Sequence, residues 1–158
     1  MSHSAAAYAL FTDALGSHEG TSAWLEIDQA RINAFADVTD DHQFIHVDPD
    51  RAAKETPWGK PIAHGFLTLS LLVRMLDDIV QNPTFIEGLV MGINYGFDKV
   101  RFINPVVVNA KIRVSSTYAA VELKGNNILL TRSMTVEIEG ETKPALSAQW
   151  LTMMVYAD

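Results

Sequence analysis

The sequence contains no cysteine. Disulfide bonds, thiolate nucleophiles and cysteine-based metal sites are therefore excluded, and the absence is typical of proteins from a reducing cytoplasm. Basic residues are also few, since 12 Lys and Arg stand against 19 Asp and Glu and give a net charge of −7. Nucleic acids are held largely through Lys and Arg contacts to phosphates, so we expect no nucleic-acid partner.

Long apolar runs are lacking as well. No stretch approaches the roughly 18 apolar residues that span a bilayer. The apolar N-terminal stretch has no basic start and is interrupted by Thr12 and Asp13. We therefore expect no membrane association, no signal peptide and a cytoplasmic location. With 48% apolar and 20% charged residues, the 158 residues predict a single globular domain over residues 1–158.

The first half of the chain shows apolar residues at helical spacing. We predict short helices over residues 5–15 and after Asp28, and a third that begins at Asp48-Pro49. Asp48 suits the N-cap, and Pro49 suits the first helical turn, where its missing N–H would be unpaired in any case. The polar, irregular segment 39–47 is predicted to be a loop.

The segment from His64 to Val80 places apolar side chains in nearly every direction around a helix, which predicts a long buried helix. From Leu89 onwards the apolar period is mostly two, which is typical of an antiparallel sheet with one wet face. The Gly-Asn-Asn sequence at 125–127 indicates a hairpin turn. The predicted fold class is α+β, with one curved antiparallel sheet wrapped around one long central helix.

Histidines and aspartates gather in one polar zone. Asp41, His42 and His46 lie close together in the sequence, and His64 follows at the start of the predicted buried helix. In a chain without cysteine, imidazoles, carboxylates and hydroxyls are the groups left for proton transfer. Histidine is well suited, since its unperturbed pKa of about 6.5 lets it exchange a proton near neutral pH. We therefore expect the functional site in this zone.

Three segments resemble signatures of a known family. Residues 35–49 carry an Asp, four residues, a His, a small apolar residue and Asp-Pro, which resembles the first signature of the MaoC-like, R-specific enoyl-CoA hydratases. Residues 60–67, with Pro-Ile-Ala-His-Gly, are similar to the second signature, and residues 94–106 resemble the third. The chain looks closest to the branch labelled nodulation-protein-N-like.

This resemblance implies a hot-dog fold, a homodimer and the hydration of trans-2-enoyl thioesters to (R)-3-hydroxyacyl thioesters. The substrate implied is an acyl-CoA thioester or the corresponding acyl carrier protein thioester. We expect neither a cofactor nor a metal ion.

Hydration of an unsaturated thioester needs a base, an acid and donors for the thioester oxygen. Asp41 and His46 can grip one water and supply acid and base from one face, which predicts syn addition; which residue is the acid stays open. We assign the Gly65 backbone N–H as the oxyanion donor, because N–H groups at a helix start are unpaired and the dipole favours negative charge. His64 is expected to orient the loop.

The resemblance also assigns secondary roles. Some family members carry a serine further down the central helix, where Val73 stands here, so Thr68 or Ser70 is expected to substitute. Lys99 and Arg101 match basic residues that meet the phosphates of coenzyme A in the family. For both of them a solvated strand face is the alternative interpretation.

Three other functions remain open on the sequence. A thioesterase on the same fold would use a carboxylate to activate water against the carbonyl. A metal hydrolase would use His42, His46 and His64 with Asp41, since imidazole and carboxylate ligands suit zinc. A non-catalytic module would bind acyl-CoA without turnover, because one fold hosts many functions.

Overall fold

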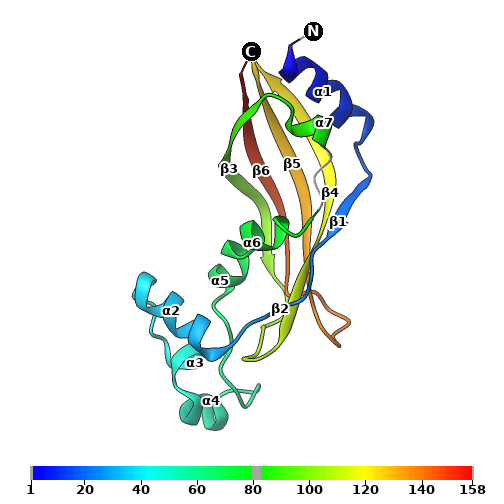
Figure 1. The fold of residues 1–158 in the computed structure, drawn as a ribbon. Helices are drawn as coiled ribbons and strands as arrows, with labels where there is room; N and C mark the ends of the chain where they lie inside the picture. The colour runs from blue at the N-terminus through cyan, green and yellow to red at the C-terminus, as the bar shows by residue number, and fades with distance from the viewer. Residues whose placement is uncertain (1, 80–82, 158) are drawn as a thin grey trace.

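A six-stranded antiparallel sheet forms the centre of the molecule in the computed structural model, which describes residues 2–79 and 83–157 (Figure 1). The strands follow the order β1-β4-β5-β6-β3, and the short β2 pairs with β4. Their bounds are β1 His18–Thr21, β2 Leu25–Glu26, β3 Leu89–Phe102, β4 Lys111–Lys124, β5 Asn127–Ile138 and β6 Leu146–Tyr156. Strand β3 is therefore a long edge strand.

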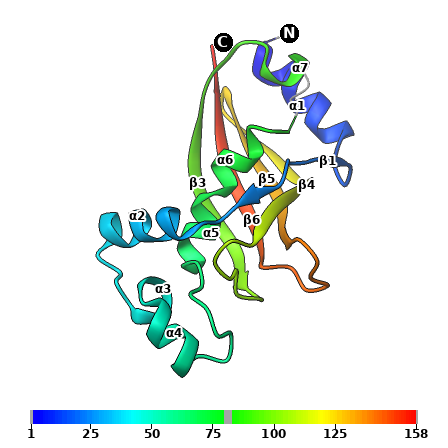
Figure 2. The same cartoon turned by 60° about the horizontal axis from the view of Figure 1, so that its bottom comes forward.

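The helices occupy three places around this sheet. Helices α5 and α6 lie against one face, α2 to α4 gather beyond one end, and α1 and α7 lie at the other end near both termini (Figures 1 and 2). The helices are α1 His3–Asp13, α2 Gln29–Thr39, α3 Phe44–Val47, α4 Pro49–Glu55, α5 Gly65–Ser70, α6 Leu72–Leu76 and α7 Pro83–Ile86. The predicted α+β class is confirmed.

Both predicted helix caps are confirmed. The Asp28 carboxylate accepts a hydrogen bond from the Arg31 N–H at 2.8 Å and starts α2. The Asp48 carboxylate accepts from the Arg51 N–H at 3.0 Å and starts α4, with Pro49 in its first turn. Each cap satisfies an N–H that the helix itself leaves unpaired.

The predicted helix from His64 to Val80 is two consecutive helices. His64 is the N-cap of α5, and α6 ends at Leu76. Between them Leu71 keeps helical angles, φ −70° and ψ −9°, so the two helices follow one direction. Val80 lies outside the described residues.

The expectation that this segment is buried on every side is wrong for a single chain. Leu72 and Met75 are fully buried against the sheet, whereas Phe66 is 66% and Val73 49% exposed. One sheet covers only one side of a helix, so the apolar residues of the other side have no cover within the chain.

One further prediction fails locally, and one strand was not predicted. The segment 39–47, predicted as a loop, contains α3. A helix of one turn is too short for the apolar spacing that predicts helices. Strand β1 was not predicted because its sequence, His-Glu-Gly-Thr, has no apolar alternation.

The apolar core lies in two parts. The larger one fills the space between α5, α6 and the inner face of the sheet, where Met134, Val136 and Leu146 are fully buried. The smaller one lies under α1 and α7, where the rings of Phe11 and Phe85 stack at 4.5 Å. No helix among the described residues is long and apolar enough to cross a membrane.

Candidate active site

Asp41 owes its position to the way α2 ends. The C-cap residue Asp40 adopts the left-handed conformation, with φ 57°, which turns the chain away from the helix axis. Asp41 follows directly and is exposed. Its carboxylate accepts a long hydrogen bond, 3.4 Å, from the N–H of Gln43.

His46 lies on α3 and is only 6% exposed. Its Nδ1 lies 2.6 Å from the backbone oxygen of Ile62. A carbonyl oxygen can only accept, so Nδ1 carries the proton and donates it. The lone pair of the neutral ring is therefore on Nε2, which is the atom available as a base.

His64, the N-cap of α5, is 2% exposed. Its Nε2 donates to the backbone oxygen of Asp41 at 2.9 Å, which fixes the proton on Nε2 by the same reasoning. Its Nδ1 is buried and has no hydrogen-bond partner among the described residues. His64 thus ties the helix start to the Asp41 backbone and leaves one unused acceptor beside it.

The structure brings the three predicted residues together. The rings of His46 and His64 stack with centroids 3.8 Å apart and an interplanar angle of 24°. One side-chain nitrogen or carboxylate oxygen from each of Asp41, His46 and His64 lies within 4.8 Å of the other two. A single water molecule can span a cluster of this size.

The environment keeps His46 neutral. Burial lowers the pKa of His46 below its ordinary value of 6.5, and the neighbouring His64 lowers the pKa further. The hydrogen bond to Ile62 and the carboxylate of Asp41 act in the opposite direction, but the net change is downward. An imidazole that is neutral at pH 7 can accept a proton there.

The ring stacking disfavours a metal ion in this cluster. A histidine lone pair lies in the plane of its ring, so two histidines that share an ion need ring planes that meet at the ion. The planes of His46 and His64 are nearly parallel and separated by the stacking distance. The donor types suit zinc, but the ring orientation suits a hydrogen-bonded water better.

Two residues near the cluster differ from the sequence-based expectation. His42, a candidate ligand of the metal alternative, is exposed and forms a 2.9 Å pair with Asp37, whose hydrogen bond raises the pKa of His42. Gln29 was not predicted. Its side-chain amide donates to the backbone oxygen of His46 at 2.7 Å and holds α3 against α2. A glutamine in a helix gives no sign in the sequence that it binds a distant carbonyl.

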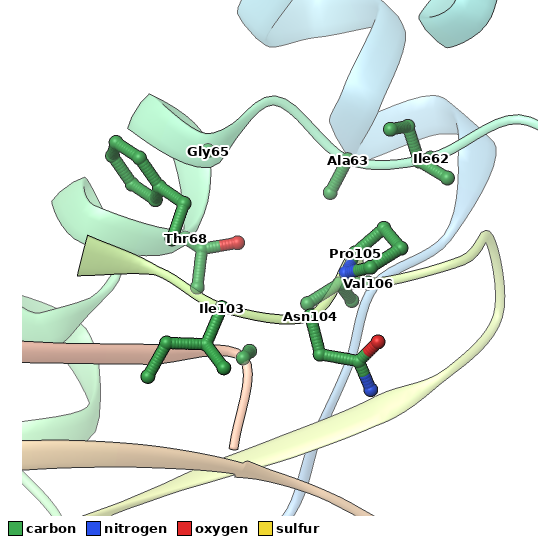
Figure 3. Close-up of a pocket in the computed structure, with 10 residues that line it drawn as sticks. Ile62, Ala63, Gly65, Thr68, Ile103, Asn104, Pro105 and Val106 are labelled. Carbon is green, nitrogen blue, oxygen red and sulfur yellow. The ribbon is translucent and has the colours of Figure 1, made fainter. Parts of the chain in front are cut away.

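Gly65 begins α5 beside a cavity of about 240 Å³ (Figure 3). Thr68 also lines this cavity, whereas the Ser70 hydroxyl donates to the Phe66 backbone oxygen, so Thr68 is the better placed of the two predicted substitutes for serine. A Cβ at position 65 would lie 2.9 Å from the ring of Phe102, so any side chain there must displace that ring.

Lys99 and Arg101 lie near the end of β3 and are exposed. Lys99 has a left-handed conformation, φ 53°, at an irregularity in the pairing with β6. Arg101 Nη1 donates to the backbone oxygen of Val100 at 2.7 Å. The next residue, Phe102, contacts the Gly65 position, so the basic pair is close to the α5 start along the chain.

Comparison with known proteins identifies the family. The family described as the MaoC like domain matches residues 10–139. The chain belongs to the MaoC-like dehydratase family.

Named relatives agree with this membership. The chain is 53% identical to nodulation protein N of Rhizobium meliloti over 140 residues, which cover 88% of this chain and 85% of that protein. It is 46% identical to 3-hydroxyacyl-thioester dehydratase Z of Mycobacterium tuberculosis over 143 residues, or 90% of this chain and 91% of the relative. The predicted resemblance to the MaoC-like family and its nodulation-protein-N-like branch is confirmed.

The fold also matches the solved structure of an R-hydratase. The R-hydratase PhaJ1 from Pseudomonas aeruginosa superposes with a TM-score of 0.70 at 22% identity, over 90% of this chain and 83% of that chain. The hot-dog fold is therefore confirmed. Membership in this dehydratase family indicates an enzyme of the hydro-lyase class.

Proposed function

We propose that the protein is an (R)-specific enoyl-CoA hydratase. It would add water reversibly, in a syn sense, to trans-2-enoyl-CoA and give (R)-3-hydroxyacyl-CoA. The convergence of Asp41, His46 and His64 within 4.8 Å is the observation that supports this most directly. The names of the dehydratase and hydratase relatives support the reaction class and the R configuration.

His46 acts as the base in the hydration direction. Its neutral Nε2 takes one proton from the bound water, while the carboxylate of Asp41 accepts a hydrogen bond from the other O–H and orients the oxygen toward the β carbon. The new C–O bond forms there, and the electron pair of the double bond moves toward the thioester. The His46 imidazolium then returns its proton to the α carbon. Both additions come from one face, as syn addition requires.

The Gly65 N–H stabilises the enolate oxygen. It lies in the first turn of α5, where N–H groups have no partner within the helix. The neighbouring cavity accepts the thioester, and the Thr68 side chain faces it (Figure 3). Oxyanion donors of this kind are worth about 10²–10³-fold in rate.

Lys99 and Arg101 bind the phosphates of the carrier. Both are exposed cations at the end of β3 that reaches the α5 start. The same charges would suit the phosphopantetheine of an acyl carrier protein, so the geometry supports a thioester carrier with phosphate groups rather than one particular carrier.

The enzyme functions as a homodimer. The edge strand β3 spans 14 residues, and Val90, Ile93 and Tyr95 on it are 56%, 47% and 62% exposed. The 66% exposed Phe66 of α5 continues this apolar face, since its ring contacts Phe102 of β3. A long exposed edge strand presents unpaired backbone N–H and C=O groups that can bind another strand. Two copies related by a two-fold axis can pair their β3 edges in antiparallel fashion.

The test is hydration of crotonyl-CoA, followed by the loss of enoyl absorbance and by chiral analysis of the product. Asp41→Asn and His46→Gln should each reduce kcat by at least about 10²-fold, with unchanged thermal unfolding. Asp37→Asn and His42→Gln are matched controls, since this pair is nearby in the chain but exposed. Both should retain wild-type turnover.

Other outcomes identify other functions. Wild-type turnover in either catalytic variant would refute the assignment of that residue. Release of free thiol from acyl-CoA without hydration would indicate a thioesterase, and tight acyl-CoA binding without any turnover would indicate a binding module.

A further inference from the structure

A second cavity of about 470 Å³ lies further along the central helices. Val73 and Leu76 of α6 form one side of it, and Trp150 and Thr152 of β6 form the other. Val73 follows Gly65 by eight residues, which is about 12 Å along a helix. The cavity thus lies between the helices and the sheet, beyond the proposed catalytic groups, where the outer part of an acyl chain would extend.

The sheet side of this cavity is polar in the part nearer the α5 start and apolar farther out, where Leu89, Gly92 and Met154 line it. Two cross-strand neighbours carry polar groups, because Arg132 of β5 pairs with Trp150 and Asn94 of β3 pairs with Thr152. All four residues line the cavity. A binding site for a plain hydrocarbon chain has no use for four polar side chains along one wall.

Two of these side chains have unmet hydrogen bonds. Trp150 Nε1 and Thr152 Oγ1 are buried and have no partner among the described residues. An indole N–H can only donate, whereas a hydroxyl can donate or accept. Buried polar groups are almost always paired, so an unpaired pair on one cavity wall points to a ligand atom that completes them.

Arg132 presents a third set of donors. Its side chain is only 5% exposed, and its Nε and Nη2 donate to the buried carboxylate of Glu19 at 2.8 and 3.1 Å. The ion pair with Glu19 thus uses two of its three guanidinium nitrogens and leaves Nη1 outside the pair. Glu19 neutralises the guanidinium charge, and the carboxylate of Asp77 also lines the cavity. The wall therefore offers donors without a net positive charge.

We propose that this cavity selects acyl chains that carry an uncharged oxygen, a hydroxyl or a carbonyl, remote from the thioester. The inference rests on the proposed hydratase function, because it assigns the outer part of the same substrate. A plain hydrocarbon would exclude water and leave the indole N–H and the Thr152 hydroxyl without partners. Sites built in this way reject the analogue that lacks the polar group. A terminal carboxylate meets Asp77 and an already neutralised arginine, so it is disfavoured.

The test compares three substrates with the same ten-carbon chain: trans-2-decenoyl-CoA, its 10-hydroxy derivative, and the carboxylated chain in which C10 itself is a carboxylate. We expect kcat/KM for the hydroxylated chain to exceed that for the plain chain by about tenfold or more, and the carboxylated chain to be the poorest. Thr152→Val and Trp150→Phe should each bring the ratio of hydroxylated to plain substrate toward one. Thr131→Val is the matched control, since Thr131 precedes Arg132 and faces the opposite side of the sheet, and it should leave the ratio unchanged.

The outcomes separate this inference from the proposed function. A wild-type preference for the plain chain, or a ratio that Thr152→Val and Trp150→Phe leave unchanged, overturns the polar pocket even if crotonyl-CoA is hydrated. If no enoyl-CoA is hydrated, the hydratase proposal fails, and calorimetric binding of decanoyl-CoA against 10-hydroxydecanoyl-CoA measures the same preference without turnover. Thr152→Val is nearly isosteric and removes an unpaired hydroxyl, so its thermal unfolding should occur no earlier than in the wild type.

Discussion

At the scale of single residues, two backbone carbonyls determine the chemistry of the site. The oxygens of Ile62 and Asp41 each accept one histidine N–H and thereby fix both tautomers. His46 is left with a basic Nε2, and His64 with an acceptor at Nδ1. The fold therefore decides which ring nitrogen of His46 and of His64 can accept a proton, although the two residues are 18 positions apart.

The pH profile of hydration tests the role of His46. The base must be unprotonated, and burial lowers the pKa of His46 below 6.5. We therefore expect kcat/KM to be constant from pH 8 down to about 6.5 and to fall only below that value, as the imidazole becomes protonated. His42→Gln should leave this acidic limb in place, because His42 is exposed. A limb centred above 6.5 would contradict the assignment of His46 as the base.

The sequence predicted the members of the site better than their connections. Asp41, His46 and His64 were grouped by a resemblance in spacing, and the structure brings them into one cluster. The carbonyl of Ile62 and the amide of Gln29 were not predicted, because a backbone acceptor has no residue type that marks it. The roles of all these groups in catalysis remain predictions.

At the scale of elements, the start of α5 is fitted closely to the end of β3. Gly65 faces the ring of Phe102, and a Cβ there would lie 2.9 Å from ring carbon Cδ1. The close approach brings the first turn of the helix beside the cavity that the proposed thioester occupies. Glycine at this position therefore leaves room for the Phe102 ring as well as access to the helix start.

Gly65→Ala should destabilise the protein by about 1 kcal/mol, because the added methyl group displaces the half-exposed Phe102 ring. Phe102→Ala in the same chain should remove this added cost, which thermal unfolding of the single and double variants would measure. Gly96→Ala is the control. Gly96 lies on β3, like Phe102, and nothing lies within 4 Å of a Cβ added at that position. If Gly65→Ala destabilised the Phe102→Ala protein as much as it destabilises the wild type, the Phe102 ring would not be the cause of the destabilisation.

Helix boundaries were predictable where a local signal existed. The capping carboxylates of Asp28 and Asp48 are such signals, and both helices begin where they indicate. The one-turn helix α3 and the short strand β1 have no such signal and were missed. The exposure of Phe66 and Val73 was missed for a different reason. Apolar character predicts that a side chain is buried, but it does not tell which surface covers the side chain.

At the scale of the whole molecule, a buried ion pair links strands that are distant in the chain. Glu19 of β1 accepts from Arg132 of β5 and from Ser116 of the intervening β4, at 2.8 and 2.6 Å. Buried pairs of this kind add little net stability, because desolvation offsets the attraction between the charges. The presence of the pair here is better explained if Arg132 also serves the second cavity, which it lines.

The apolar face of β3 and α5 leads to a prediction about assembly. Light scattering at micromolar concentration should give twice the 17.4 kDa mass of one chain. Ile93→Glu should halve that mass, because a charge at the paired edges would lose its hydration. Leu123→Glu is a closely matched control, since both side chains are 47% exposed but Leu123 lies on β4, away from the β3 edge. A monomeric wild-type protein, or an Ile93→Glu variant that stays dimeric, would refute pairing through β3. If the variant is monomeric and also loses hydratase activity while remaining folded, the second copy is needed to complete the site as well as to cover the apolar face.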